Sequence, residues 1–388
     1  MKPSIVLRGM TWRHARGRAP MEATARRFRE LEPAIEVHWD VRSLKAFEDY
    51  PIERLAAEYD LVVLDHPCIG HAARAGALLP LDEHIPPTFL ADQARHSTGA
   101  SHRSYEHEGR LWALATDAAA PVAFWREDLL ARHGAAAPRT WADLIGLARR
   151  GHVEVPSVPI NSLMNFFSFA LLAGGRLFAE PDRLVEREAG LVALDLLREL
   201  LSLCPPGCWE RDPIASHELV ASAGNDVLCY CPFAYGYSNY ARDGFAAHRL
   251  VFGPPPIHEG REFSTVLGGA GLAISARTRH AAEASRYAQF VASPEIQRTL
   301  YTHSGGQPGH RTAWLDAENN RLTHGYFERL LPVLDRAWLR PRHDGYLRFQ
   351  EDGAHVVQGA LRGTLPAGEA LARLDELHRT TFQPRPAS

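Results

Sequence analysis

Residues 5–39 read IVLRGMTWRHARGRAPMEATARRFRELEPAIEVHW, and residues 52–64 read IERLAAEYDLVVL. Five segments of this stretch alternate between strand and helix character, namely 5–7, 21–31, 35–39, 52–59 and 61–64. The order strand, helix, strand, helix, strand is typical of an α/β unit with a parallel sheet. In such a sheet the ligand lies beyond the carboxyl ends of the strands. We therefore expect ligand contacts in the loops 9–18 and 65–68.

The rest of the chain predicts a second domain. A length of 388 residues is too great for one compact core. Further helices are expected over 141–150, with Thr140 as the N-cap, and over 164–172, 191–203, 281–292 and 369–380, and further strands over 122–125, 227–231, 249–252 and 272–274. We expect residues 1–116 and 269–311 to form lobe 1, and residues 117–268 and 312–388 to form lobe 2.

Several segments carry a resemblance to a known family. They include A-G-A-L-L-P-L-D at 75–82 and P-R-T-W-A-D-L at 138–144. The others, in chain order, are 28–37, 59–65, 109–114, 123–130, 268–275, 281–297 and 305–308. Taken in order, they resemble family 1 extracellular solute-binding proteins, the sugar and polyol receptors of ABC importers that include maltose-binding protein.

This resemblance implies a two-lobed α/β fold of the type II periplasmic-binding-protein class. Each lobe would hold a mixed sheet flanked by helices, with a helical C-terminal part. It implies non-catalytic binding of a small polar solute in a cleft between the lobes, delivery to an ABC permease, and closure near Asp117, Gly268 and Arg311. We expect a monomer without metal or cofactor. Thr116-Asp117 and Phe124-Trp125 depart from the family pattern, which argues against a maltose-like pocket.

Composition and charge limit the classes of partner that this chain can have. The formal net charge is −3 and the basic residues are scattered, which disfavours nucleic acid as a partner. No apolar run approaches the ~20 residues that a membrane span requires. Arginines at 8, 13, 16 and 18 follow the first apolar segment, where an export signal would stay apolar. The resemblance indicates the periplasm or cell envelope, whereas the N-terminus leaves open a cytoplasmic binding or sensing protein without a transporter.

The candidate ligand contacts come from the strand-end loops and the segments between the lobes. A sugar receptor needs flat aromatic faces and polar groups that match hydroxyls. The predicted contacts are Trp12, His14, Asp65, His66, Asp117, Trp125, Asn165, Tyr235, Tyr237, Tyr240, Gly268, Gly269 and Arg311. Trp12 is selected because it stands in an expected loop. Asp65 and His66 have a turn-forming alternative, and the two glycines can serve either as a hinge or as backbone donors.

The segment 230–240 holds the densest aromatic cluster, with five aromatic residues broken by Pro232 and Gly236. Its tyrosines line the cleft or pack in the core. Asn161 and Asn165 mark a helix start, and Asn161 has the alternative role of N-cap. Arg16, Arg311 and Arg340 are candidate partners for an anion, so a small carboxylate remains the alternative to a sugar or polyol.

Enzymatic and redox alternatives find little support. The sequence has no H-E-x-x-H, no G-x-S-x-G, no phosphate loop and no dinucleotide fingerprint. Four of the five cysteines, at 204, 208, 229 and 231, have three interpretations. They are buried or half-buried thiols, a Cys204–Cys208 disulfide, or ligands of a zinc ion with unusual spacing.

Overall fold

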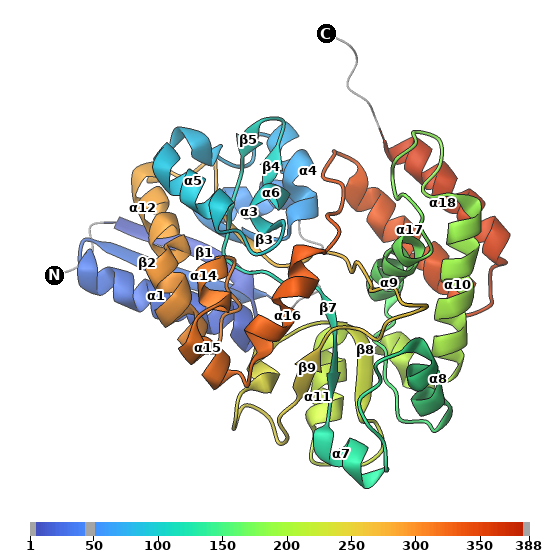
Figure 1. Cartoon of the computed structure of the whole chain (residues 1–388). Coiled ribbons are helices and arrows are strands. Elements are labelled where there is room, and N and C mark those ends of the chain that lie inside the picture. The colour runs from blue at the N-terminus through green and yellow to red at the C-terminus, as the bar shows by residue number, and fades with distance from the viewer. Residues whose placement is uncertain (1–4, 43–50, 383–388) are drawn as a thin grey trace. The chain divides into compact units, whose positions relative to one another are not determined.

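The computed structural model describes residues 5–42 and 51–382, and the chain divides into two compact units. Unit 1 comprises the chain up to Ala119, Leu267–Asp335 and Arg342–Asp344. Unit 2 comprises Ala120–Val266, Arg336–Pro341 and the chain from Gly345 onward. We expected the chain to pass between the lobes after residues 116, 268 and 311. The chain changes unit after Ala119, after Val266 and after Asp335. Figure 1 colours the chain from blue to red, so the blue, cyan and orange ribbons are unit 1.

Unit 1 is built around a five-stranded sheet of order β2-β1-β3-β10-β6. These strands are β1 (Ile5–Trp12), β2 (Ile35–Arg42), β3 (Leu61–Leu64), β6 (Leu114–Ala115) and β10 (Gly271–Ile274), and β4 (Glu106–His107) with β5 (Arg110–Leu111) forms a separate hairpin. The expected parallel sheet is confirmed, because β1 pairs in parallel with both β2 and β3. The later strand β10 lies between β3 and β6 and runs antiparallel to both, so the sheet is mixed.

Helices and short 3-10 or π turns make up the rest of unit 1. They are α1 (Ala15–Leu31), α3 (Ile52–Glu58), η1 (His66–Cys68), α4 (Ile69–Arg74), η2 (Leu81–Glu83), α5 (Pro87–Arg95), α6 (Ser101–Ser104), α12 (Ala281–Ala292), α13 (Pro294–Ile296), η5 (Gln297–Tyr301), α14 (Arg311–Trp314), α15 (Ala317–Leu322) and α16 (Tyr326–Asp335). The helices α1 and α12 pack together, with the rings of Phe28 and Tyr287 5.2 Å apart. Buried Leu7, Met10 and Val62 form part of the core beneath them.

The α1 region differs from the sequence prediction in two respects. The first strand continues to Trp12 rather than ending at Leu7, and the helix begins at Ala15 rather than Met21. His14 explains the early start, because its side chain caps the helix by accepting from Arg16 N. Pro20 is consequently an interior residue of α1 and not a first-turn proline.

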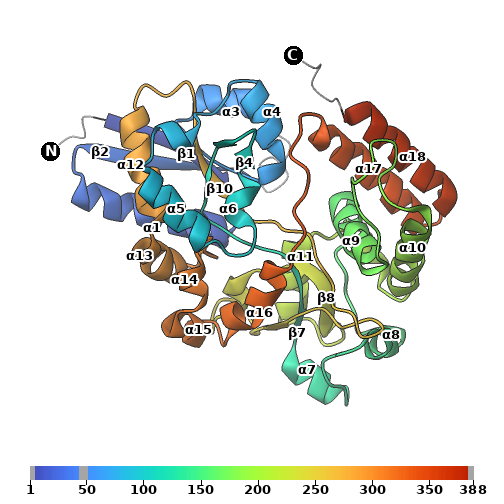
Figure 2. The same cartoon turned by 45° about the horizontal axis from the view of Figure 1, so that its top comes forward.

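Unit 2 combines a small antiparallel sheet with a layer of helices. Its sheet has the order β8-β7-β9, formed by β7 (Pro121–Trp125), β8 (Tyr230–Tyr235) and β9 (Val251–Gly253). Its helices are α7 (Glu127–Arg132), α8 (Trp141–Arg149), α9 (Pro159–Leu172), α10 (Arg187–Ser202), η3 (Pro206–Glu210), α11 (Pro213–Ala221), η4 (Ser238–Ala241), α17 (Tyr346–Leu361) and α18 (Ala367–Thr381). Helix α9 packs against α10 and α17, as Figure 2 shows. Phe166, Phe167 and Phe169 of α9 are fully buried in this core.

Two local expectations in unit 2 are decided by the structure. Thr140 is the N-cap of α8 as predicted, within a capping box that Asp143 completes.

The cysteines are free thiols: Cys208, Cys229 and Cys231 are buried and Cys204 is half-buried, which excludes the Cys204–Cys208 disulfide in this structure. Burial raises the pKa of Cys208 and of Cys229 to about 11, so both stay protonated at neutral pH. No helix in the described part of the chain is long and apolar enough to cross a membrane.

Candidate functional site

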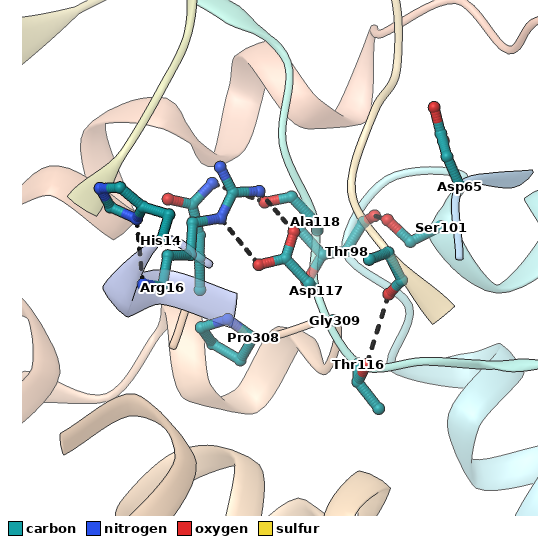
Figure 3. A network of polar contacts seen from close by, with 12 residues as sticks. His14, Arg16, Asp65, Thr98, Ser101, Thr116, Asp117, Ala118, Pro308 and Gly309 are labelled. Atoms are coloured by element: carbon teal, nitrogen blue, oxygen red, sulfur yellow. Dashed lines mark hydrogen bonds and ion pairs between the residues drawn. The ribbon is translucent and has the colours of Figure 1, made fainter. Parts of the chain in front are cut away.

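Four segments of unit 1 lie at one edge of its sheet, which we call the carboxyl edge. Strands β1, β3 and β6 run in the same direction, so their carboxyl ends lie at the same side of the sheet. Strand β10 starts there, since Gly271 pairs with both Leu64 and Ala115. The carboxyl edge consists of residues 12–16, 65–66, 116–118 and 268–270. Figure 3 shows part of it from close by.

A buried ion pair between Arg16 and Asp117 joins two of these segments (Figure 3). Arg16 Nε donates to Asp117 Oδ2 over 2.8 Å, and Arg16 Nη2 donates to the other carboxylate oxygen. The side chains are 5% and 0% exposed. Burial raises the pKa of Asp117, and the Arg16 guanidinium opposes that rise. Because a buried charge without its partner is costly, each of these two groups requires the other.

His14 supports this pair from the helix start. Its Nδ1 accepts a hydrogen bond from Arg16 N over 3.0 Å, which orders the first turn of α1. Burial, with a smaller effect of the Arg16 charge, lowers the pKa of His14 to about 4. The imidazole is therefore neutral at neutral pH and acts as a cap. Its predicted role in ligand binding remains a prediction.

Asp65 and His66 follow β3 with contrasting exposure. Asp65 Oδ1 accepts from His66 N over 2.8 Å, which is the turn-forming contact that sequence analysis named as the alternative. The Asp65 side chain is 34% exposed and near enough to Asp117 to raise the pKa of that group. The His66 side chain is buried and meets the ring of Tyr105 edge-on at 6.3 Å. Of these two residues, Asp65 is the one with a surface that a solute can reach.

Trp12 is the last residue of β1 and not part of a loop. Its backbone pairs with Arg42, and its side chain is buried among the core residues of unit 1. The indole covers Gly17, where an added Cβ would approach Trp12 Cδ2 to 2.3 Å. The reason for selecting Trp12, its position in an expected loop, was therefore wrong, and its contact with a ligand stays a prediction.

Gly268 and Gly269 connect β10 to the rest of the carboxyl edge. Gly268 and Ala119 exchange two backbone hydrogen bonds, of 2.8 and 3.3 Å. Gly269 has φ +110°, and a Cβ there would lie 2.3 Å from the carbonyl oxygen of Asp117. Glycine is required at 269 because the backbone of Asp117 passes so close.

Sequence analysis missed the contribution of residues 307–309 to this edge. Gln307 Nε2 donates to Ala118 O over 2.7 Å, and Gln307 Oε1 accepts from the Tyr326 hydroxyl over 3.0 Å. Gly309 N donates to Thr116 O over 3.1 Å. The G-G-Q-P pattern at residues 305–308, which belongs to the family resemblance, was the one sign in the sequence that this segment contributes to the site. Arg311, which follows, forms a bidentate ion pair with Asp335 at 2.5 and 2.7 Å.

The predicted aromatic residues of unit 2 do not lie together. Tyr235 pairs with Pro121, at the end of β7 next to the change of unit, and is half-buried. Tyr237 and Tyr240 are buried against the His217 ring, at 5.6 and 5.0 Å. Trp125 is at the opposite end of β7 and stacks on Tyr230 at 6.0 Å. Tyr235 is therefore the aromatic candidate nearest the chain crossing.

Asn161 and Asn165 lie one turn apart in the first half of α9. The helix begins at Pro159 with Val158 as its cap, so Asn161 is not the N-cap. The side chains are buried, yet Asn161 Oδ1 and Asn165 Nδ2 have no hydrogen-bond partner among the described residues. A buried polar atom left unpaired costs about 1–3 kcal/mol. Groups of this kind are suited to hydrogen-bond a bound solute.

Comparison with known proteins gives both the fold and the family. T. maritima MalE3 with maltose bound superposes with a TM-score of 0.84 at 18% identity, covering 97% of this chain and 100% of that one. A solute-binding protein of an ABC transporter from Agrobacterium radiobacter K84, in complex with ribitol, gives 0.81 at 17% identity and covers 98% and 100%. One from Thermotoga lettingae TMO, bound with α-D-tagatose, gives 0.81 at 18% identity, again covering 98% and 100%. These likenesses confirm the predicted periplasmic-binding-protein fold.

The sequence itself matches a family profile over residues 54–319, which is more than half of the chain. This profile describes bacterial extracellular solute-binding proteins. The predicted resemblance and the prediction of a binding protein rather than an enzyme are both confirmed. The chain belongs to the family of bacterial extracellular solute-binding proteins.

Proposed function

We propose that this chain is the receptor of an ABC importer for a neutral sugar or polyol. The observation that carries the choice of a neutral solute is that two of the three candidate arginines are paired with carboxylates. The third, Arg340, is buried and donates to Gln350 Oε1 over 2.9 Å. Arg16 is engaged by Asp117 and Arg311 by Asp335, each through two hydrogen bonds to a carboxylate. A guanidinium already held by two carboxylate oxygens is a poor partner for a second carboxylate. This favours hydroxyl groups over an acidic ligand.

Candidate contacts for such a solute occur on each unit. On unit 1, the Asp65 carboxylate is partly exposed and accepts hydrogen bonds, which suits sugar hydroxyls. On unit 2, the Asn161 and Asn165 amides supply an acceptor and a donor without partners among the described residues. Tyr235 supplies an aromatic face of the kind that packs on the apolar side of a sugar ring. Solved structures of the same fold with maltose, ribitol or tagatose bound support this class of solute.

A ligand screen tests the proposal. The purified full chain is heated with maltose, ribitol, tagatose or mannitol, and separately with small mono- and dicarboxylates. A solute that binds only the native state at 100 times its Kd adds about 2.7 kcal/mol to the free energy of unfolding, which is seen as a higher melting temperature. We expect at least one neutral polyhydroxy compound to stabilise the protein and the carboxylates to have no effect. Stabilisation by carboxylates alone would contradict the choice of solute.

Membership of an extracellular family supports a role outside the cytoplasm, delivering solute to a permease. This part is tested separately by reconstituting the chain with candidate ABC permeases from the same organism. Loaded receptor is expected to stimulate ATP hydrolysis, and receptor without solute is expected to stimulate it less. A receptor that binds solute but leaves hydrolysis unchanged would contradict the transport role and leave the binding role intact.

A further inference from the structure

We infer that Asp92, His96 and His310 of unit 1 form a binding site for one Zn²⁺ ion, separate from the solute contacts proposed above. One ligand atom from each residue lies within 4.8 Å of the others. Two imidazoles and one carboxylate are a ligand set that zinc binds, with a fourth position left for water. Among the described residues, no other cluster of histidine, cysteine and carboxylate groups meets this distance.

The distances between these side chains suit a shared zinc ion. His310 Nε2 lies 3.3 Å from Asp92 Oδ2, and His96 Nδ1 lies 2.9 Å from Asp92 Oδ1. Bonds of about 2.0–2.1 Å in a tetrahedron place neighbouring ligand atoms roughly 3.3 Å apart. The two rings are stacked, with centroids 5.3 Å apart and planes 30° from parallel. Small rotations of these side chains would therefore bring all three onto one ion.

The backbone holds the three ligands in place. Asp92 belongs to α5 and His96 caps its end, four residues later, so both lie on one face of the helix. His310 arrives on a distant segment that is fixed to this helix end by backbone hydrogen bonds. Arg311 N donates to His96 O over 2.6 Å, and Thr98 N donates to Gly309 O over 3.0 Å. The site is therefore largely ordered before any metal arrives.

Thr312 supplies the outer contact that a metal-bound histidine usually has. Its hydroxyl lies 2.8 Å from His310 Nδ1. His310 Nδ1 also accepts weakly from Thr312 N over 3.4 Å, so zinc on Nε2 would require the other tautomer, in which Nδ1 donates its proton to Thr312 Oγ1 and the ring orientation is fixed. The side chains of His96 and Asp92 are 36% and 37% exposed, whereas that of His310 is 1% exposed. The ion can thus enter from solvent and bind against a buried histidine.

Zinc titration of the full chain tests the site. The protein is prepared without a histidine tag and treated with EDTA, then titrated with Zn²⁺ by calorimetry and with Co²⁺ by absorption spectroscopy. We expect one tight Zn²⁺ site per chain and the visible band of four-coordinate Co²⁺. Both His96→Gln and Asp92→Asn should weaken binding by more than the roughly 10–100-fold that loss of an outer contact costs. His84→Gln, an exposed histidine of the same unit, is the matched control and should leave binding unchanged.

A second variant keeps the test decisive if a ligand variant unfolds. Thr312→Val preserves all three ligands and should weaken Zn²⁺ binding by roughly 10–100-fold, while circular dichroism stays unchanged. The proposal is overturned if the parent chain binds Zn²⁺ no more tightly than the His96→Gln variant does. It is also overturned if His84→Gln lowers the Zn²⁺ affinity as much as His96→Gln. The metals are the only probes, so the result does not depend on identifying the solute.

Discussion

The carboxyl edge of unit 1 and the start of α9 in unit 2 both present buried polar side chains, but in different states. At the carboxyl edge, Arg16 and Asp117 satisfy one another, and Gln307 bonds to a backbone oxygen and to a tyrosine hydroxyl. In α9, Asn161 and Asn165 each retain an atom without a partner among the described residues. Polar groups that are satisfied within the protein stabilise the fold, whereas unsatisfied ones reduce stability until a ligand binds. We therefore propose a mainly structural role for the first group and a binding role for the second, and the variants below test both.

The largest expected effect follows from breaking the Arg16–Asp117 pair. Asp117→Ala leaves a buried guanidinium without its carboxylate, which should lower the free energy of unfolding of unit 1 by about 3–5 kcal/mol. Urea denaturation measures this loss. The double variant Arg16→Met with Asp117→Leu removes both charges and should recover most of it. Asp335→Ala breaks a pair whose side chains are 33% and 39% exposed, and should cost less than about 1 kcal/mol. A similar loss in both single variants would contradict the structural role.

Gly269→Ala should have the next largest effect. The left-handed backbone costs an alanine roughly 1–2 kcal/mol, and the overlap with Asp117 O adds about 1–3 kcal/mol. Gly76→Ala is the control, since Gly76 has φ +58° and nothing lies within 4 Å of its added Cβ. Thermal unfolding of both variants separates the two contributions. Equal losses would mean that the close approach at Asp117 has no energetic weight.

Unlike the two preceding variants, Asn165→Leu should weaken solute binding and leave the stability of the fold nearly unchanged. Leucine has the same number of side-chain heavy atoms and none that is polar, so the free energy of unfolding without solute should change by less than about 0.5 kcal/mol or increase. Affinity for the solute found in the screen should fall by about five-fold for each hydrogen bond lost, or roughly 1 kcal/mol. Ser168→Ala in the same helix removes a satisfied bond to Met164 O and should show the opposite pattern. Calorimetry and urea denaturation of both variants would decide between the two roles.

The smallest expected effect is on the stability of the fold at acid pH, through His14. The pKa of His14 falls from 6.5 in the unfolded chain to about 4 in the fold, so between these values the unfolded state binds more protons. The stability that His14 contributes is therefore complete above pH 6.5 and decreases as the pH falls toward 4. His14→Asn keeps a capping side chain but does not titrate. The variant should match the parent near pH 7 and lose less stability by pH 4.5, as measured by urea denaturation. Parallel pH profiles would contradict this assignment.

The fold was predictable where the signals are local, and the site was only partly so. Alternation of apolar segments predicted β1, β2 and β3, and the rule of carboxyl ends selected the loops 9–18 and 65–68, which hold Arg16 and Asp65. The partner of Asp117 was not predictable, because Arg16 lies 101 residues away and no pattern links them. For the same reason the cluster of Asp92, His96 and His310 was missed and no metal ligands were predicted, since His310 is 218 residues from Asp92. The alternative that Asn161 is an N-cap was wrong, because the helix starts earlier, at Pro159.

The position of β10 in the sheet of unit 1 has a consequence for synthesis. This strand fills the gap between β3 and β6, yet the ribosome adds it only after residues 120–266 of unit 2. Until then the nascent chain carries two strands with open edges, a state that invites pairing with other chains. Unit 2 also waits, because α17 and α18 follow residues 267–335 of unit 1 in the chain. Each unit is therefore completed only after part of the other has been made, and a chain truncated before residue 271 completes neither.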